Sequence, residues 1–222
     1  LGRIGRADEQ RKLLADAADR AASGHRESLL ERLASACLDA RDLPCAARAA
    51  QRLVESAPED LDEGRRLAAF ASLAGARFAA EPALDALALV NSVAGRFGPE
   101  TLPDVYGTGA RAADAQGAFD QSVTLWIEAL NRRTDRAWIR EAMRGAERAG
   151  AADRLLAFFE KQRARSPRDV RWAIVVRELR LANRDLAGAI EVSKAAVQVR
   201  PEKRELWTET ADLLERDGRP QE

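Results

Sequence analysis

Few residues in this sequence have the types and spacing that catalysis requires. The single histidine, His25, stands next to a glycine, and no cysteine or serine can be placed beside it as the partner of a general base. The segment GTGARA at 107–112 imitates a dinucleotide-binding glycine motif, but it follows no strand and lies in no βαβ unit. We therefore expect no enzyme activity and no cofactor.

The only two cysteines, Cys37 and Cys45, are close in the sequence but match no CxxC or metal-binding spacing. We expect no metal site and interpret both residues as buried free thiols. The alternative is a disulfide across the turn between two antiparallel helices. That bond would imply an oxidising compartment.

The charge balance limits the classes of partner. The chain has 36 Lys and Arg against 36 Asp and Glu, so its formal net charge is zero and its pI is near 6.9. It has no basic excess for binding DNA or RNA nonspecifically, and we expect no nucleic-acid partner. No stretch approaches the roughly 18 apolar residues of a membrane span, so we expect none.

The sequence opens LGRIGRADEQ, with neither an initiator Met nor the apolar run of a signal peptide. We expect that the chain was cut from a longer protein. A targeting signal would then lie outside it, and the sequence does not decide between a cytoplasmic and a periplasmic location.

A repeated pattern indicates the elements that organise the chain. Trp138, Trp172 and Trp207 are separated by 34 and 35 residues, and Pro167 and Pro201 by 34. A fixed period of this length is typical of stacked helix–turn–helix repeats. Aromatic residues are only 5% of the chain and alanine dominates the apolar set, which favours thin, closely stacked helices.

We expect residues 1–222 to form a single helical-repeat array. Pro58 and Pro99 are 41 residues apart, so the unit between them is longer and less regular than the others. The expected units are a partial repeat made of a second helix at 1–24, repeats at 27–60, 61–102 (irregular), 103–136, 137–168 and 169–203, and a partial repeat made of a first helix at 204–222.

Turn and cap residues recur with the same period. We expect a left-handed conformation at the ends of first helices, where glycine or asparagine stands at Gly117, Gly150, Asn183 and Gly218. Asp135 and Asp169 are expected to cap the helices that follow them. The tryptophans early in first helices are expected to fill the gaps between units.

At these residues the sequence resembles the tetratricopeptide repeat (TPR) family, and it looks like part of a larger bacterial protein. The match is best from about Pro103 onward. The matching residues are Trp172, Val176, Ala189, Ala196 and Pro201; then Trp207, Ala211, Leu214 and Gly218; and Tyr106, Ala110, Gly117, Trp126 and Ala129. The resemblance implies an all-α fold, a right-handed α-solenoid of antiparallel helix pairs. Its concave groove would bind an extended peptide or a partner's helix.

Carrying the family's groove positions onto this sequence gives a set of seven candidate partner-binding residues, four of them arginine. The set consists of Arg111, Arg140, Met143, Arg177, Arg180, Thr208 and Asp212. Arg140, Arg177 and Arg180 would form a basic strip for an acidic peptide. The alternative is ordinary surface pairing with Glu141, Glu147 and Glu178.

One TPR subfamily grips a C-terminal carboxylate with lysine and asparagine. The corresponding positions here are Ile139, Met143, Ala173 and Arg177, so we do not expect that function.

The sequence thus predicts a non-catalytic protein–protein interaction scaffold whose partner is another protein or peptide. The resemblance also permits an alternative, a periplasmic TPR segment of a bacterial exopolysaccharide-export protein that recruits a partner enzyme. A third hypothesis is an oligomerisation or rigid-spacer role without a dedicated ligand.

Overall fold

The computed structural model describes residues 2–57, 59–81 and 83–219, with side chains from residue 6 onward, and in this part of the chain all regular structure is α-helical. The chain divides into two compact units, Leu1–Leu125 (unit 1) and Trp126–Glu222 (unit 2). The helices are α1 (Gly2–Arg20), α2 (His25–Asp39), α3 (Leu43–Val54), α4 (Glu63–Ala80), α5 (Ala86–Ala94), α6 (Leu102–Ala115), α7 (Phe119–Arg132), α8 (Arg136–Arg148), α9 (Ala152–Arg165), α10 (Val170–Ala182), α11 (Leu186–Val199) and α12 (Arg204–Arg216).

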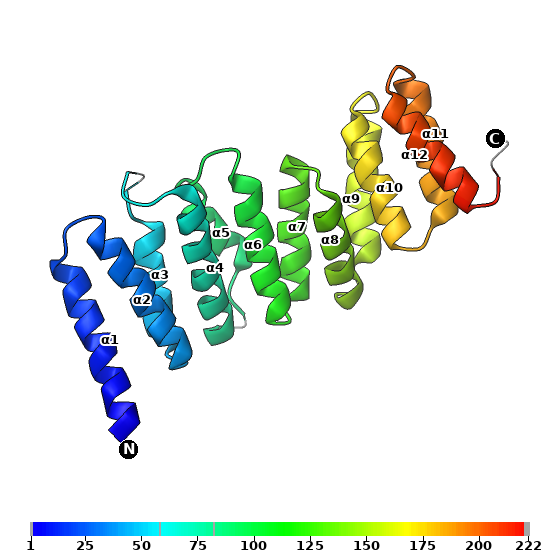
Figure 1. The fold of residues 1–222 in the computed structure, drawn as a ribbon. Coiled ribbons are helices and arrows are strands. Elements are labelled where there is room, and N and C mark those ends of the chain that lie inside the picture. Colours follow the sequence, from blue (N-terminus) through cyan, green and yellow to red (C-terminus); the bar gives the residue numbers. More distant parts are fainter. Residues whose placement is uncertain (1, 58, 82, 220–222) are drawn as a thin grey trace. The chain divides into compact units, whose positions relative to one another are not determined.

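The helices pack in consecutive pairs, which confirms the all-α fold class (Figure 1). In unit 1, α2 packs on α1 and α3, and α4 packs on α3 and α6. In unit 2, α10 packs on α8, α9 and α11, and α11 packs on α12. Each expected helix has a counterpart, while the boundaries of the repeats stay a prediction. Pro58, one of the two prolines whose spacing marked the long unit, lies outside the described residues.

Left-handed residues mark the helix ends at the expected period. Gly150, Arg184 and Gly218 have φ of 63°, 61° and 75° and are 34 residues apart. The residue after each one donates its N–H to a carbonyl five residues back, as Ala151 does to Ala146 at 2.7 Å. This bond satisfies a carbonyl that the helix end would leave without a partner. Gly117, with φ of 77°, follows the same rule, as expected.

Asn183 was expected to be the left-handed residue of its turn, and this is wrong. Asn183 has φ of −82° and belongs to the end of α10, whereas Arg184 takes the positive φ. The left-handed position lies one residue beyond the helix cap, and the N–H of Asp185 then reaches the carbonyl of Arg180 at 2.8 Å.

Six of the described helices begin with an aspartate whose side chain caps them. The carboxylates of Asp135 and Asp169 accept hydrogen bonds from the backbone N–H groups of Trp138 at 3.0 Å and Arg171 at 3.1 Å, as the sequence predicted. The same arrangement is found at Asp42, Asp62, Asp85 and Asp185. Each cap satisfies a backbone donor that the first helical turn leaves without a partner.

The long unit at 61–102 has a short second helix. That helix, α5, has only nine residues, and Leu84 and Phe97 fall outside its ends. Phe97 is nevertheless buried and packs edge-on against Phe70 of α4, with ring centroids 6.4 Å apart. The segments around α5 therefore contribute core residues without being helical.

The GTGARA segment serves helix packing. It lies inside α6, where a Cβ added at Gly109 would stand 2.6 Å from Cγ2 of Val90 and 3.2 Å from Cδ1 of Leu125. The absence of a side chain at Gly109 therefore lets α6 approach its neighbours closely.

Cys37 and Cys45 form a disulfide, with their Cα atoms 5.7 Å apart, and no described cysteine is free. The expectation of two free thiols is therefore wrong, and the disulfide alternative is the one found. Cys37 is in the last turn of α2 and Cys45 in the first turn of α3, so the short turn between these packed helices brings their side chains together. The bond joins the two helices of the expected 27–60 repeat.

Candidate interaction surface

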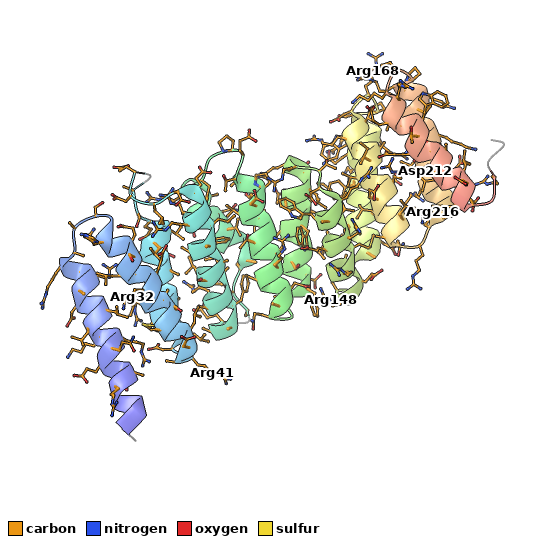
Figure 2. All side chains as sticks on the ribbon, viewed as in Figure 1. Arg32, Arg41, Arg148, Arg168, Asp212 and Arg216 are labelled. Atoms are coloured by element: carbon orange, nitrogen blue, oxygen red, sulfur yellow. A yellow bond between two sulfur atoms is a disulfide. The ribbon has the colours of Figure 1, made fainter. Side chains whose placement is uncertain are left out.

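Six of the seven candidate residues belong to α8, α10 and α12 of unit 2, the expected first helices of that unit. Arg140, Thr208 and Asp212 are exposed, and Arg180 is half-buried. Figure 2 labels Asp212 on α12. The seventh residue, Arg111, is exposed on α6 and belongs to unit 1.

Two candidate side chains are buried. Arg177 is only 3% exposed, so the expectation that its guanidinium faces an open groove is wrong. Met143 is 1% exposed and supplies part of the floor of a cleft along α8. Both side chains are held inside the fold, because their positions on α8 and α10 face the neighbouring helices.

The guanidinium of Arg177 is neutralised inside unit 2. It donates to Glu178 at 2.8 Å and to Glu209 of α12, and Glu209 also accepts from Arg136 of α8. Arg136 stands 3.5 Å from Glu178 as well, which closes a four-residue network. The network connects α8, α10 and α12, so it helps to fix the spacing of the three first helices.

The network also shifts the pKa values of two of its members, Glu209 and Arg136. Burial alone would raise the pKa of the Glu209 carboxyl, but the hydrogen bonds and charges of Arg177 and Arg136 more than offset this and hold that pKa below its usual value. The hydrogen bond to Glu209 in turn raises the pKa of Arg136. Both shifts favour the charged forms of Glu209 and Arg136.

Arg180 is also engaged within the chain. It donates to Glu160 of α9 at 2.6 Å and to Asp185 at 2.6 Å, and the bond to Glu160 raises the pKa of Arg180. The backbone N–H of Gly188 donates to Asp185 and, with Arg180, lowers the pKa of that carboxyl. Two of the three arginines of the expected basic strip are thus neutralised by the chain's own carboxylates.

The third arginine of the strip, Arg140, faces a surface of mixed charge. Its Nε donates to the carbonyl of Arg136 at 3.2 Å. It lines a cleft of about 440 Å³ on α8, together with Ala137, Glu141, Met143, Arg144, Glu147 and Ala182. The cleft contains two arginines and two glutamates, so it offers groups for both signs of charge.

The tryptophans of unit 2 are not equivalent. Trp138 packs on Trp126 with ring centroids 6.1 Å apart, and Trp172 packs on Phe159 at 6.0 Å. The aromatic partner stands 12 or 13 residues before each tryptophan (138−126 and 172−159), whereas the residue 13 before Trp207 (207−13) is Lys194. A buried packing role was expected for the in-phase tryptophans, and this is wrong for Trp207, which is 54% exposed.

Trp207 lies in an open groove of about 510 Å³ between α11 and α12. Its indole N–H donates to the carbonyl of Pro201 at 2.8 Å, which fixes the ring. The groove is also lined by Lys194, Val197, Gln198, Thr210, Ala211, Asp212, Leu214 and Glu215. A fixed aromatic ring beside apolar and charged groups is the kind of surface that protein partners use.

Glu209 and Arg136 are the important residues that sequence reasoning missed. Arg177 and Glu209 are 32 residues apart (209−177), close to one repeat length. This spacing of opposite charges on successive first helices is the sequence signal that could have predicted the ion pair.

His25 is exposed at the start of α2. Among the described residues, no group of three or more His, Cys, Asp or Glu side chains is arranged to hold a metal ion. None of the described helices combines the length and apolar character that crossing a membrane demands.

Comparisons with known proteins do not identify the family. No family model matches the chain, and no curated protein matches it. Among solved structures, the crystal structure of the MamA protein aligns over 89% of this chain and 96% of MamA, with 12% sequence identity and a TM-score of 0.31.

Proposed function

We propose that the chain is a non-catalytic scaffold that binds a partner protein or peptide through the first-helix surface of unit 2. The observation that carries this proposal is the exposure of Trp207 in the α11–α12 groove. Tryptophan is among the residues most enriched at energetic hot spots of protein interfaces. The TPR resemblance implies a concave groove lined by first helices, and α12, which carries Trp207, is one of these helices.

Asp212 lines this groove, and Thr208 is an exposed neighbour of Trp207 on α12. Arg140 adds an exposed cation on α8. With Arg177 and Arg180 neutralised within the chain, a predominantly acidic partner is not required. The partner that fits best presents an apolar side chain to Trp207 and a donor group to Asp212.

The test is site-specific crosslinking followed by a binding measurement. A photoreactive amino acid at Thr208 should give discrete protein adducts, whereas the same group at Lys161, exposed on α9, should give none. With the identified partner in purified form, Trp207→Ala should weaken binding by about thirtyfold, as hot-spot truncations of about 2 kcal/mol do. Equal adducts at both positions, or an unchanged Kd in the variant, would sink the proposal.

A second candidate is favoured by the disulfide. Cys37 and Cys45 are bonded, and disulfides persist chiefly in oxidising compartments such as the bacterial periplasm. This supports the alternative of a periplasmic TPR segment of an exopolysaccharide-export protein that recruits a partner enzyme. Mass spectrometry of the native protein after thiol blocking tests it: blocked, reduced cysteines would argue against that compartment.

A further inference from the structure

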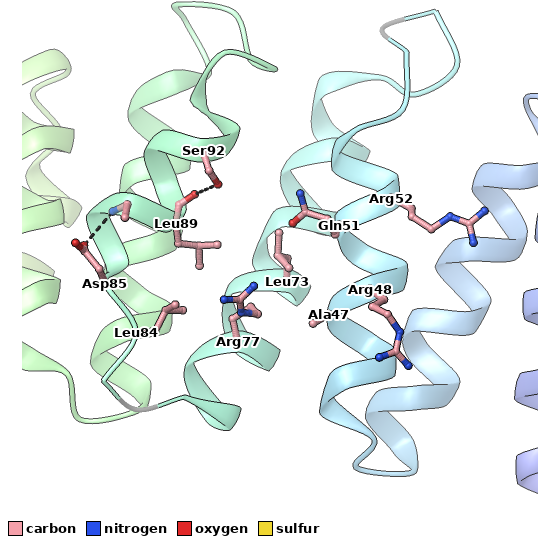
Figure 3. A pocket seen from close by; sticks show the side chains of 11 residues that line it. Ala47, Arg48, Gln51, Arg52, Leu73, Arg77, Leu84, Asp85, Leu89 and Ser92 are labelled. Atoms are coloured by element: carbon pink, nitrogen blue, oxygen red, sulfur yellow. Dashed lines mark hydrogen bonds between the residues drawn. The ribbon is translucent and has the colours of Figure 1, made fainter.

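A second groove, in unit 1, has no part in the surface proposed above. It lies between α3 and α5 and has a volume of about 650 Å³, within the range of about 300–1,000 Å³ that is common for binding clefts. Figure 3 shows Leu73 and Arg77 of α4 between Ala47 and Gln51 on one side and Leu84 and Leu89 on the other. Its floor is therefore built from leucines.

The groove lies beside the short helix α5. In unit 2 the corresponding space, between second helices α9 and α11 over α10, has a volume of only about 180 Å³. There α11 has fourteen residues, and Val192, Ala196 and Val199 line the small space together with Ala173. In unit 1 the nine residues of α5 leave the leucine floor accessible.

The rim of the groove is basic. Arg48 is exposed and has no ion pair within the described part of the chain. Arg77 approaches Glu81 only at 3.5 Å, and its buried Nε has no hydrogen-bond partner among the described residues. Arg52, the third arginine, turns toward α1 and pairs with Asp19 at 2.8 Å.

The one carboxylate that lines the groove is already engaged. Asp85 accepts the backbone N–H of Ala88 at 3.0 Å as the cap of α5. Two arginines that line this apolar groove, Arg48 and Arg77, therefore lack carboxylates that would fully neutralise them. An occupant that complements both features must be apolar on one side and acidic beside it.

We propose that this groove binds an acidic amphipathic helix of a partner protein. The aliphatic ridge of that helix would lie on Leu73, Leu84 and Leu89, and its flanking carboxylates would pair with Arg48 and Arg77. An amphipathic helix inserted in a groove between helices is a recurrent recognition mode. The proposal is independent of the scaffold surface in unit 2, since all of these residues belong to unit 1.

Fluorescence anisotropy with labelled peptides tests the proposal on the full chain. The probe is a helical peptide of about 18 residues, with leucines at i, i+3, i+4 and i+7 spacing and glutamates beside them. The first comparison peptide replaces each glutamate by lysine, and the second scrambles the order. The glutamate peptide should bind saturably and more weakly as NaCl is raised, whereas the other two should not bind.

Variants of the chain localise the binding. Arg48→Glu with Arg77→Glu should weaken binding of the glutamate peptide by about tenfold or more. Ala88→Trp, at an exposed position that lines the groove, should block it sterically. The matched control is Arg32→Glu, which changes an exposed arginine of α2 outside the groove (Figure 2) and should leave binding unchanged.

Three results would overturn the proposal: equal binding of the lysine peptide, binding of the scrambled peptide, or full affinity in both groove variants. Circular dichroism of each variant must show the helix content of the unsubstituted chain. If Arg48→Glu with Arg77→Glu unfolds, Ala88→Trp alone decides the outcome. If Trp207 proved to bind no partner, binding of the glutamate peptide to unit 1 would still be expected. Each of the two proposals can therefore fail without the other.

Discussion

Units 1 and 2 are both built of paired helices, but they are held together by different means. Unit 2 contains all four tryptophans, two cross-helix aromatic pairs and left-handed residues 34 positions apart in sequence, at 150, 184 and 218. Unit 1 has no tryptophan, a disulfide and the short α5. The regular unit has closed the space between its second helices to about 180 Å³, while the irregular one leaves about 650 Å³.

This difference indicates that a strict repeat favours closure. When aromatic and small residues return at a constant spacing, each helix meets the same shape in its neighbour and little space is left between them. Where the spacing lengthens, as between Pro58 and Pro99, one helix is shortened and a groove remains open. Irregularity in the array is thus a guide to where a ligand has room.

The largest effect is expected in the aromatic core of unit 2. Trp172→Ala should lower the free energy of unfolding by about 3–5 kcal/mol, because the side chain is buried against Phe159 and its removal leaves a cavity. Urea denaturation followed by tryptophan fluorescence measures it, since every tryptophan belongs to unit 2. A loss below about 1 kcal/mol would mean that the aromatic pair does not stabilise that unit.

In unit 1 the corresponding test is the disulfide. Replacing both cysteines by serine should lower the stability of unit 1 by about 2–4 kcal/mol, because the cross-link restricts its unfolded chain. Circular dichroism, which reports on the helices of both units, should show the loss. The unfolding midpoint followed by tryptophan fluorescence, which reports on unit 2 alone, should fall less. If both signals showed the same fall in midpoint, the two units would not unfold separately.

The sequence predicted what is local or periodic. The 34-residue spacing of Trp138 and Trp172 predicted the helix pairs, and Asp135 and Asp169 predicted caps, because such signals depend on a few adjacent residues. The candidate surface was predicted less well. Whether a side chain such as Arg177 is exposed depends on contacts with residues a whole repeat away, such as Glu209, and the spacing of arginines alone does not contain that information.

The exposure of Trp207 was not predicted for the same reason. Its place in the period matches that of Trp172, but its burial depends on whether an aromatic residue stands about 13 positions earlier, where the chain has Lys194. The α3–α5 groove was not predicted either. Only the length of α5 reveals it, and helix ends are the least certain part of any sequence-based assignment.

The ion network gives unit 2 a third means of stabilisation. Arg177→Met should lower the free energy of unfolding by about 1.5–3 kcal/mol, because Glu178 and Glu209 each lose a charge-assisted hydrogen bond. Arg140→Met is the control, since Arg140 is exposed and should change stability by less than about 0.5 kcal/mol. If both substitutions changed the free energy of unfolding equally in urea denaturation, the buried ion network would contribute nothing to stability.

The same network should make unit 2 sensitive to acid. The pKa of Glu209 is lowered in the folded chain from a usual value of 4.5, so the folded state favours the ionised carboxylate. Its contribution is therefore present above that usual value and is lost as the pH falls through the lowered pKa. Glu209→Gln should be less stable than the unsubstituted chain at neutral pH, and the difference should shrink in acid. A constant difference across urea denaturation curves from neutral to acidic pH would contradict this.

The smallest effect is expected at Trp207, and it is the most informative for function. Trp207→Ala should change the free energy of unfolding by less than about 0.5 kcal/mol, because the ring is 54% exposed and has no aromatic partner like that of Trp172. Iodide should quench the fluorescence of one tryptophan readily in the unsubstituted chain, and Trp207→Phe should abolish that accessible fraction. If Trp207→Ala proved as destabilising as Trp172→Ala, the indole would be part of the core and would not be available to a partner. A stable variant that loses its quenchable tryptophan would instead leave partner binding as the remaining reason for a fixed, exposed indole on α12.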